Sequence, residues 1–166
     1  MTTQLAIRNI FTFCLLFVLF SCHRPADSLT HQESTEIKHD VRAMMDTLAR
    51  DLFHEGPIAW LKYFENTPDF FMVSGGQLVF QNGDSANAFI KNNLVKQIRK
   101  IDLHWSNVRI DPMTSRFATV AANWNEDLTD FANIKTTQAG YFTAVAEKTI
   151  EGWHLRNAHW SEKIKY

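Results

Sequence analysis

Cysteine is nearly absent from this chain of 166 residues, and its only two cysteines, Cys14 and Cys22, lie close to the start. The sequence beyond Cys22 therefore offers no disulfide, no catalytic thiolate and no cysteine-ligated metal site. Packing alone has to stabilise that part of the chain. Large side chains are available for a core or a lined cavity, because aromatic residues make up 13% of the sequence.

The motifs that usually indicate metal or nucleotide chemistry are also missing. There is no HExxH motif, and no two of His104, His154 and His159 lie within four residues of each other. Gly75 and Gly76 lie between two predicted strands and not before a helix, so they do not form a phosphate-binding loop. No serine has the surroundings of a nucleophile elbow. We therefore expect neither a metal nor a cofactor.

Charge of one sign is not concentrated in this sequence, which has 17 basic and 18 acidic side chains. A nucleic-acid-binding protein usually carries a basic stripe, and none is present. Long apolar runs are scarce as well. The longest, over residues 10–20, is shorter than the ~20 apolar residues that a membrane-spanning helix needs.

That apolar run belongs to a segment with the layout of an export signal. Arg8 precedes it, and it ends at the sequence LFSC over residues 19–22. This ending resembles a bacterial lipobox, except that Phe20 stands where a small residue is usual. We predict a lipoprotein signal peptide over residues 1–21 and a lipid on Cys22, which anchors the protein to the inner or outer membrane, facing the periplasm. An uncleaved anchor helix or an ordinary secretory signal is the alternative.

The polar residues 22–34 indicate a flexible tether, and the domain is expected over residues 35–166. Its first helix is predicted from apolar residues at spacings of three and four, namely Ile37, Val41, Met44, Met45, Leu48 and Leu52. A second helix begins at Pro57, since proline suits the first helical turn. A third, over residues 85–100, is expected to be capped by Asp84 or Ser85.

The remaining elements are predicted strands. Two short apolar runs around Gly75-Gly76 favour a β-hairpin, because a Gly-Gly pair tolerates positive φ. Four more strands are expected, over residues 101–110, 116–128, 139–150 and 153–164. Helices followed by strands joined through short loops indicate an α+β fold, with an antiparallel sheet covered on one face by the helices.

The last predicted strand, GWHLRNAHWSE, alternates in character. Strand geometry places every second residue, from Trp153 to Ser161, on one face. On this face Trp153 and Leu155 are predicted to be in the core, and Asn157, His159 and Ser161 to form a pocket wall. The opposite face receives His154, Arg156, Ala158, Trp160 and Glu162. Its mixed composition suggests an interface or a partly covered outer surface.

The order of elements and the ending GWHLRNAHWS resemble the nuclear transport factor 2-like superfamily, nearest to its SnoaL-like group. The matching residues of the ending are Gly152, Trp153, Leu155, His159, Trp160 and Ser161, and the stretch YFENTPDFFMVSGG is similar to the family's passage from helix to first strand. The resemblance implies a cone-shaped antiparallel sheet wrapped around three helices, with a cavity at its open end. It also implies a homodimer formed through the convex face of the sheet. The family contains isomerases, dehydratases and cyclases, but also transport adaptors and association domains.

His159 is the candidate for acid–base chemistry, because imidazole titrates near neutral pH; it would equally satisfy a simple hydrogen-bond network. The residues expected to contact a ligand are Tyr63, Phe71, Trp124, Tyr141, Asn157, His159 and Ser161. A carboxylate among apolar neighbours would be an alternative base, since desolvation raises its pKa. Asp69, Asp102 and Glu126 are considered for this role, although each also fits a strand end or a turn. Alternation along its strand places Glu126 on the same face as Trp124, at the expected mouth of the cavity.

Three functions follow from these features. The first is an envelope domain that binds a small apolar or aromatic molecule without transforming it. The second is a cofactor-free isomerase, dehydratase or cyclase that uses His159. The third is a dimeric association module in which Trp160 and the convex face form the interface.

Overall fold

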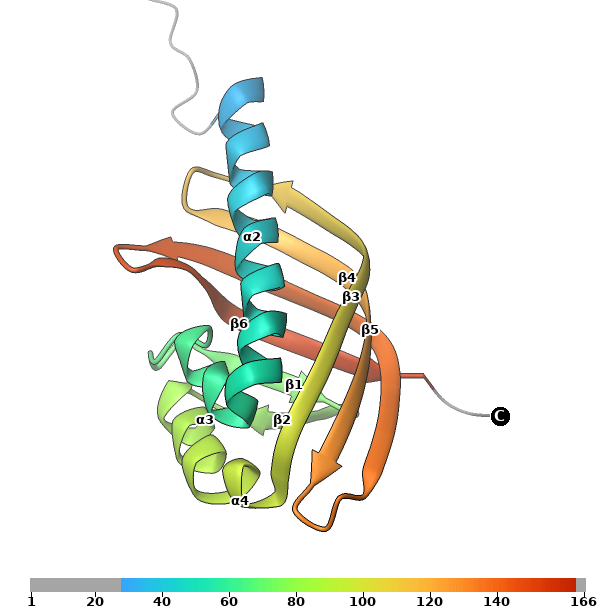
Figure 1. The fold of residues 1–166 in the computed structure, drawn as a ribbon. Coiled ribbons are helices and arrows are strands. Elements are labelled where there is room, and N and C mark those ends of the chain that lie inside the picture. Colours follow the sequence, from blue (N-terminus) through green and yellow to red (C-terminus); the bar gives the residue numbers. More distant parts are fainter. Residues whose placement is uncertain (1–27, 164–166) are drawn as a thin grey trace, which may run out of the picture.

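The computed structural model describes residues 28–163, and the predicted signal peptide and Cys22 lie outside them (Figure 1). Within that range no helix is long and apolar enough to cross a membrane. Two of the helical elements are irregular, since η2 is a 3-10 helix and η3 a π-helical turn. The elements are α2 (His31–Glu55), η2 (Gly56–Lys62), β1 (Phe71–Ser74), β2 (Gln77–Phe80), α3 (Gly83–Phe89), η3 (Ile90–Leu94), α4 (Val95–Gln97), β3 (Ile98–Pro112), β4 (Phe117–Asp130), β5 (Lys135–Thr149) and β6 (Gly152–Glu162).

The α+β architecture is confirmed: a curved six-stranded sheet wraps around helix α2 (Figure 1). The strand order is β2-β1-β6-β5-β4-β3. The sheet is mixed, however, and not antiparallel throughout, because β1 runs parallel to β6 while every other pair of neighbours is antiparallel. This pairing joins segments that are far apart in the sequence, so local patterns did not predict its direction.

Helix α2 forms where the apolar stripe predicted it, and all six residues of that stripe are buried. The helix begins at His31, four residues before the predicted start of the domain at Thr35. Thr30 and Glu33 form a reciprocal cap: the Thr30 hydroxyl accepts from the Glu33 N–H at 3.1 Å, and the Glu33 carboxylate accepts from the Thr30 N–H at 2.7 Å. Residues 31–34 are therefore helical, although their polar composition suggested a tether.

The third predicted helix, over residues 85–100, is interrupted and shorter than expected. Its cap is Asn82, whose side chain accepts from the Ser85 N–H at 2.8 Å, in place of the predicted Asp84 or Ser85. The helical turns end at Gln97, and β3 begins at Ile98. Pairing of Ile98 with β4 in the sheet outweighs the helical preference of the basic residues around it.

The predicted hairpin is confirmed, since Gly75 and Gly76 connect β1 to β2 with φ angles of 57° and 77°. Glycine adopts this left-handed region without the steric penalty that a Cβ brings. The hairpin of β4 and β5 has a shorter connection than expected. Residues 129–138 were predicted to be a loop, but β4 and β5 continue to pair almost to their connecting turn at residues 131–134.

A β-bulge divides β6 into two halves. Leu155 pairs with Ala146 and Asn157 with Val145, so Arg156 is an extra residue on β6 without a partner of its own on β5. The extra residue reverses the alternation of faces. Before it the buried residues are Trp153 and Leu155, and after it they are Ala158 and Trp160. The second half of β6 therefore presents to the interior the set that strict alternation assigned to the outside.

Candidate functional site

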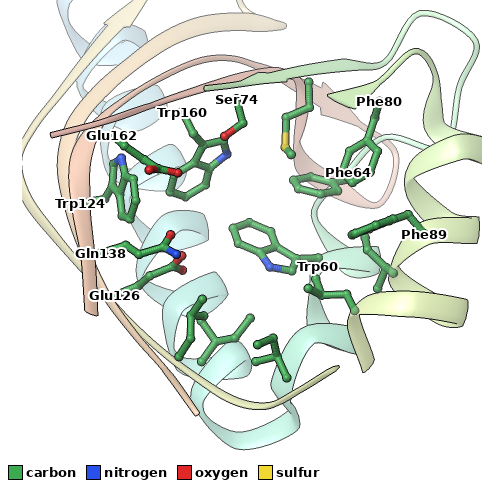
Figure 2. Close-up of a pocket in the computed structure, with 16 residues that line it drawn as sticks. Trp60, Phe64, Ser74, Phe80, Phe89, Trp124, Glu126, Gln138, Trp160 and Glu162 are labelled. Atoms are coloured by element: carbon green, nitrogen blue, oxygen red, sulfur yellow. The ribbon is translucent and has the colours of Figure 1, made fainter. Parts of the chain in front are cut away.

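A cavity of about 210 Å³ lies between the sheet and the segment that runs from η2 to α4 (Figure 2). Its floor comes from the ends of four long strands, and its sides come from η2, the β1–β2 hairpin, α3 and η3. Apolar side chains dominate the lining. The lining residues are Trp60, Phe64, Met72, Ser74, Phe80, Phe89, Ile90, Leu94, Ile98, Ile101, Trp124, Glu126, Leu128, Gln138, Trp160 and Glu162.

Three tryptophans meet at the wall of this cavity with their rings nearly perpendicular. The ring of Trp160 is at 88° to that of Trp60 and at 77° to that of Trp124, with centroids 5.8 Å and 5.2 Å apart. Phe64 stacks on Trp60 at 4.9 Å. All four side chains are at most 8% exposed, so their mutual packing fixes the shape of the wall.

Most polar groups of the lining are on one side of the cavity, where Glu126, Gln138 and Glu162 gather opposite Trp60, and Ser74 lies near Trp160 (Figure 2). Glu126 on β4 is the register partner of Gln138 on β5. Glu162 comes from the end of β6 and is exposed, whereas Glu126 is half-buried. Among residues 28–163, no salt bridge involves either glutamate, so both acidic side chains lack a cationic partner within the described chain.

The surroundings of Glu126 favour its protonated form. Burial among apolar side chains, followed by the negative charge of Glu162, raises the pKa of Glu126 from an ordinary 4.5 to about 7. A carboxyl group with this pKa exists in both protonation states at neutral pH, so it can either accept or donate a proton. This is the property required of a general acid or base.

The structure does not bring His159, Asn157 and Ser161 into the cavity. The bulge at Arg156 turns all three to the convex face of the sheet, and His159 is exposed there. The Asn157 side chain accepts from the Val145 N–H at 3.1 Å, and the Ser161 hydroxyl donates to the Tyr141 carbonyl at 3.0 Å. None of these three residues therefore belongs to the aromatic cavity, while Asn157 and Ser161 line open depressions elsewhere on the sheet.

Of the four other predicted ligand residues, only Trp124 lines the cavity. Phe71 and Tyr141 are each 43% exposed, and their strand partners Asn157 and Ser161 are convex-face residues. Tyr63 is buried next to the lining residue Phe64, but its hydroxyl donates to Asp51 at 2.8 Å. Burial and this hydrogen bond raise the pKa of the Tyr63 phenol above its ordinary value.

Trp160 is also misplaced by simple alternation, which assigned it to an outer interface. Its ring is 8% exposed and contacts Trp60, Trp105, Trp124 and Phe142. The idea that Trp160 forms a dimer interface is therefore wrong, because the ring is inside the protomer.

Only one of the three candidate carboxylates lines the cavity. Asp69 accepts from the Arg156 guanidinium at 3.0 Å and Asp102 lies 3.1 Å from the exposed His104, and neither lines the cavity. Glu126 does line it, as its alternation with Trp124 on β4 suggested. Sequence reasoning missed Glu162 and Gln138. Gln138 could have been found from the β4–β5 register, but Glu162 depends on the bulge.

The bulge residue Arg156 is the centre of a charge network that lies outside the cavity and joins β6 to Glu147 and Asp69. Its guanidinium donates to Glu147 at 2.7 Å and to Asp69 at 3.0 Å, and Arg116 donates to the second oxygen of Glu147 at 2.6 Å. Glu65 lies 4.0 Å from Arg156, and burial raises the pKa of its carboxyl. Arg156 therefore ties β6 to β5 and to the segment before β1, at the point where β6 changes face.

Solved structures with the same fold are numerous, but all those compared below have low sequence identity. A nuclear transport factor 2-like superfamily protein from Salmonella enterica serovar Typhimurium has a TM-score of 0.66 and 14% identity, with 79% of this chain and 94% of that chain covered. A candidate scytalone dehydratase from Novosphingobium aromaticivorans has a TM-score of 0.70 and 13% identity, covering 81% and 89%. The hexachlorocyclohexane dehydrochlorinase LinA-type3 from Novosphingobium barchaimii has a TM-score of 0.63 and 8% identity, covering 81% and 92%.

These similarities establish a nuclear transport factor 2-like fold, as the ending of the sequence suggested. No protein-family model matches the chain. No curated protein matches it either. The activity has to be argued from the cavity itself.

Proposed function

We propose that this protein is a cofactor-free isomerase or lyase that binds a small, mainly apolar molecule in the aromatic cavity and uses Glu126 to move a proton. The observation that carries the proposal is the position of Glu126. It is the half-buried carboxyl group of a cavity lined mainly by aromatic and aliphatic side chains, and its pKa is raised to about 7. Such a combination of a shaped pocket and a perturbed acid is typical of catalytic sites.

The reaction would begin when the ionised Glu126 accepts a proton from a substrate carbon next to an electron-withdrawing group. The electron pair of the broken C–H bond then forms a double bond. In an isomerase Glu126 returns the proton to another carbon, and in a lyase a leaving group departs with its own electron pair. The apolar walls exclude water and hold the C–H bond against the carboxylate. The neighbours named for dehydration and dehydrochlorination support this class of reaction, since both reactions are eliminations.

The proposal can be tested with cyclohexanone as a simple carbon acid. In deuterium oxide, the wild-type protein should accelerate exchange of the protons next to the carbonyl, observed by proton NMR. Glu126→Gln should reduce the acceleration by roughly 100-fold, since general bases contribute on that order or more. Glu151→Gln, at an exposed turn residue, is the matched control and should retain the wild-type rate. An equal rate for wild type and Glu126→Gln would contradict the proposal.

Binding without turnover is the second candidate, and the extent of the apolar lining supports it. In this case a ligand would raise the thermal unfolding midpoint by mass action, while the same compound would remain chemically unchanged. Ligand-dependent stabilisation of both wild type and Glu126→Gln, with no proton exchange in either protein, would favour this candidate over the enzyme.

We also propose that Cys22 carries a lipid that anchors the protein in the cell envelope, as the sequence LFSC over residues 19–22 suggests. Expression in a bacterial host with a radiolabelled fatty acid should label the wild type but not Cys22→Ser. Membrane fractionation of the wild type and of Cys22→Ser would then show which of the two proteins is in the membrane. Fatty-acid label that persists in Cys22→Ser would contradict lipidation at this position.

Homodimerisation through the convex face is a further proposal, supported by the exposed aromatic side chains of Phe71 and Tyr141. Tyr141→Asp should then shift the protein from dimer to monomer in size-exclusion chromatography with light scattering. A monomeric wild type, or a variant that dimerises equally well, would contradict this interface.

A further inference from the structure

The cavity carries an imbalance of charge that the proposed reaction does not explain. Among residues 28–163, its only ionisable lining residues are the acids Glu126 and Glu162, and no Lys, Arg or His of this range contributes to the wall. A carboxylate that is partly buried, as Glu126 is, is normally paired with a cation or with hydrogen-bond donors, and the exposed Glu162 adds a second negative charge beside it. Here the described chain supplies no cation for either of them. An anionic ligand would therefore be repelled, and a cationic ligand would be favoured.

The aromatic walls have the chemistry to hold such a cation. Ammonium groups are attracted to the negative faces of aromatic rings, most strongly to tryptophan. Trp60 and Trp124 each stand nearly perpendicular to Trp160, at 88° and 77°, so neighbouring indole rings form the sides of a corner. Phe64 stacks on one face of Trp60 and supports that ring from one side. The polar side with Glu126, Gln138 and Glu162 faces Trp60 across the open space (Figure 2).

We propose that the ligand of this cavity is a substituted ammonium ion, a tertiary or quaternary amine with apolar groups, held between the tryptophan rings and the two glutamates. The proposal names the ligand class of the same cavity and rests on the proposed function only in requiring that the cavity binds a small molecule. A quaternary cation of this kind is weakly hydrated and has no N–H group to direct a hydrogen bond, and a tertiary one has a single N–H. It therefore suits a wall of aromatic rings with charge at one side.

The bound cation would also change the state of Glu126. A positive charge nearby favours the carboxylate, so the pKa of Glu126 would fall when the ligand enters. The group would then be ionised at neutral pH while substrate is present, which is the state that accepts a proton. Binding of the cation would therefore ionise the carboxyl group that accepts the proton.

Benzyltrimethylammonium and its uncharged carbon isostere, neopentylbenzene, are the probes for the experiment, since they differ only by a nitrogen in place of a carbon. Their dissociation constants would be measured by intrinsic tryptophan fluorescence for wild type, the double variant Glu126→Gln/Glu162→Gln, and the control Glu151→Gln. The double variant should bind the ammonium probe at least about tenfold more weakly, which corresponds to about 1.4 kcal/mol. It should bind the uncharged probe as tightly as wild type or more tightly.

A second measurement tests the aromatic contact without any variant. Protons held over an aromatic face resonate upfield, so the N-methyl signal of benzyltrimethylammonium should move upfield on binding to the wild-type protein. Benzyltrimethylammonium whose N-methyl signal does not move on binding would overturn the aromatic part of the proposal.

The outcomes separate this inference from the proposed function. If the double variant weakens both probes equally, or neither, recognition of ammonium is overturned, while the apolar cavity and its proton transfer to cyclohexanone remain. If neither probe binds the wild-type protein, the ammonium inference is overturned and the cyclohexanone experiment alone decides whether the cavity is a site. Selective loss of the charged probe supports the inference, even where cyclohexanone exchange is absent.

Discussion

Two glutamates on neighbouring strands, Glu126 on β4 and Glu147 on β5, differ sharply in their partners. The Glu147 carboxylate accepts from Arg116 and Arg156, one on each oxygen, and its side chain is 8% exposed. Glu126 has no cation beside it in the described chain and faces tryptophan rings instead. The paired glutamate fixes the architecture around the bulge. The unpaired glutamate is costly to ionise, which is typical of a group that is used rather than one that stabilises.

Removing the partner of the paired glutamate should have the largest effect on stability. Arg156→Ala leaves Glu147 with only the exposed Arg116, and it also releases Asp69. Breaking a buried ion pair costs about 3 kcal/mol. We expect a loss of that order in the free energy of unfolding, measured by urea denaturation at neutral pH.

The matched control for this prediction is Arg116→Ala, because Arg116 bonds the same carboxylate but its side chain is 66% exposed. Exposed ion pairs contribute up to about 1 kcal/mol, so this variant should lose much less stability. Equal losses for the two variants would contradict the central role of Arg156.

Neutralising the unpaired glutamate, Glu126, should increase the free energy of unfolding. The pKa of Glu126 is about 7 in the folded protein against an ordinary 4.5, so the folded state binds more protons between these two values. The free energy of unfolding therefore falls as pH rises through this window, and the penalty is complete above it. Glu126→Gln removes the penalty and should stabilise the protein by up to about 3 kcal/mol at alkaline pH.

This gain should disappear below the lower end of the window, because the carboxyl group is then neutral in both states. Urea denaturation of wild type, Glu126→Gln and Glu151→Gln at pH 8 and at pH 4 would measure it. A variant that is less stable than wild type at both pH values would show that Glu126 has a stabilising partner.

The smallest expected effect concerns the two cavity glutamates. The charge of Glu162 contributes to the raised pKa of Glu126, but burial contributes more. Glu162→Gln should therefore lower the pKa of Glu126 only slightly and leave it above its ordinary value. Carbon NMR of the Glu126 carboxyl group during a pH titration would measure the change. A pKa of Glu126 that is the same in the variant as in the wild type, or higher, would contradict the like-charge interaction.

Much of the fold was predictable because it depends on local patterns. The apolar stripe of α2 and the Gly75-Gly76 turn each follow from the spacing of neighbouring residues. The alternation along β4 also placed Trp124 and Glu126 on the correct face. These features need no information about which strands pair in the sheet.

The pocket wall on β6 was not predictable, because it depends on which residues of β5 pair with β6. The strand reads as one unbroken alternation, and nothing near Arg156 in the sequence marks it as a bulge residue. Its position is set by the β5 register and by the charges of Glu147 and Asp69, which are distant in sequence. One extra residue exchanged the two faces of the strand. It moved His159 outward and brought Trp160 and Glu162 into the cavity.

The short parallel pairing of β1 with β6 has a consequence for how molecules reach the cavity. The hairpin that supplies Met72, Ser74 and Phe80 to the lining has strands of four residues, and it joins the sheet through β1 alone. The neighbouring strands β4 and β5 are 14 and 15 residues long. A small unit held at one edge opens with less free energy than the whole domain. Amide hydrogens of this hairpin should therefore exchange with solvent before those of β4 and β5. A ligand in the cavity should slow that exchange. Ligands would then enter the cavity when the hairpin opens.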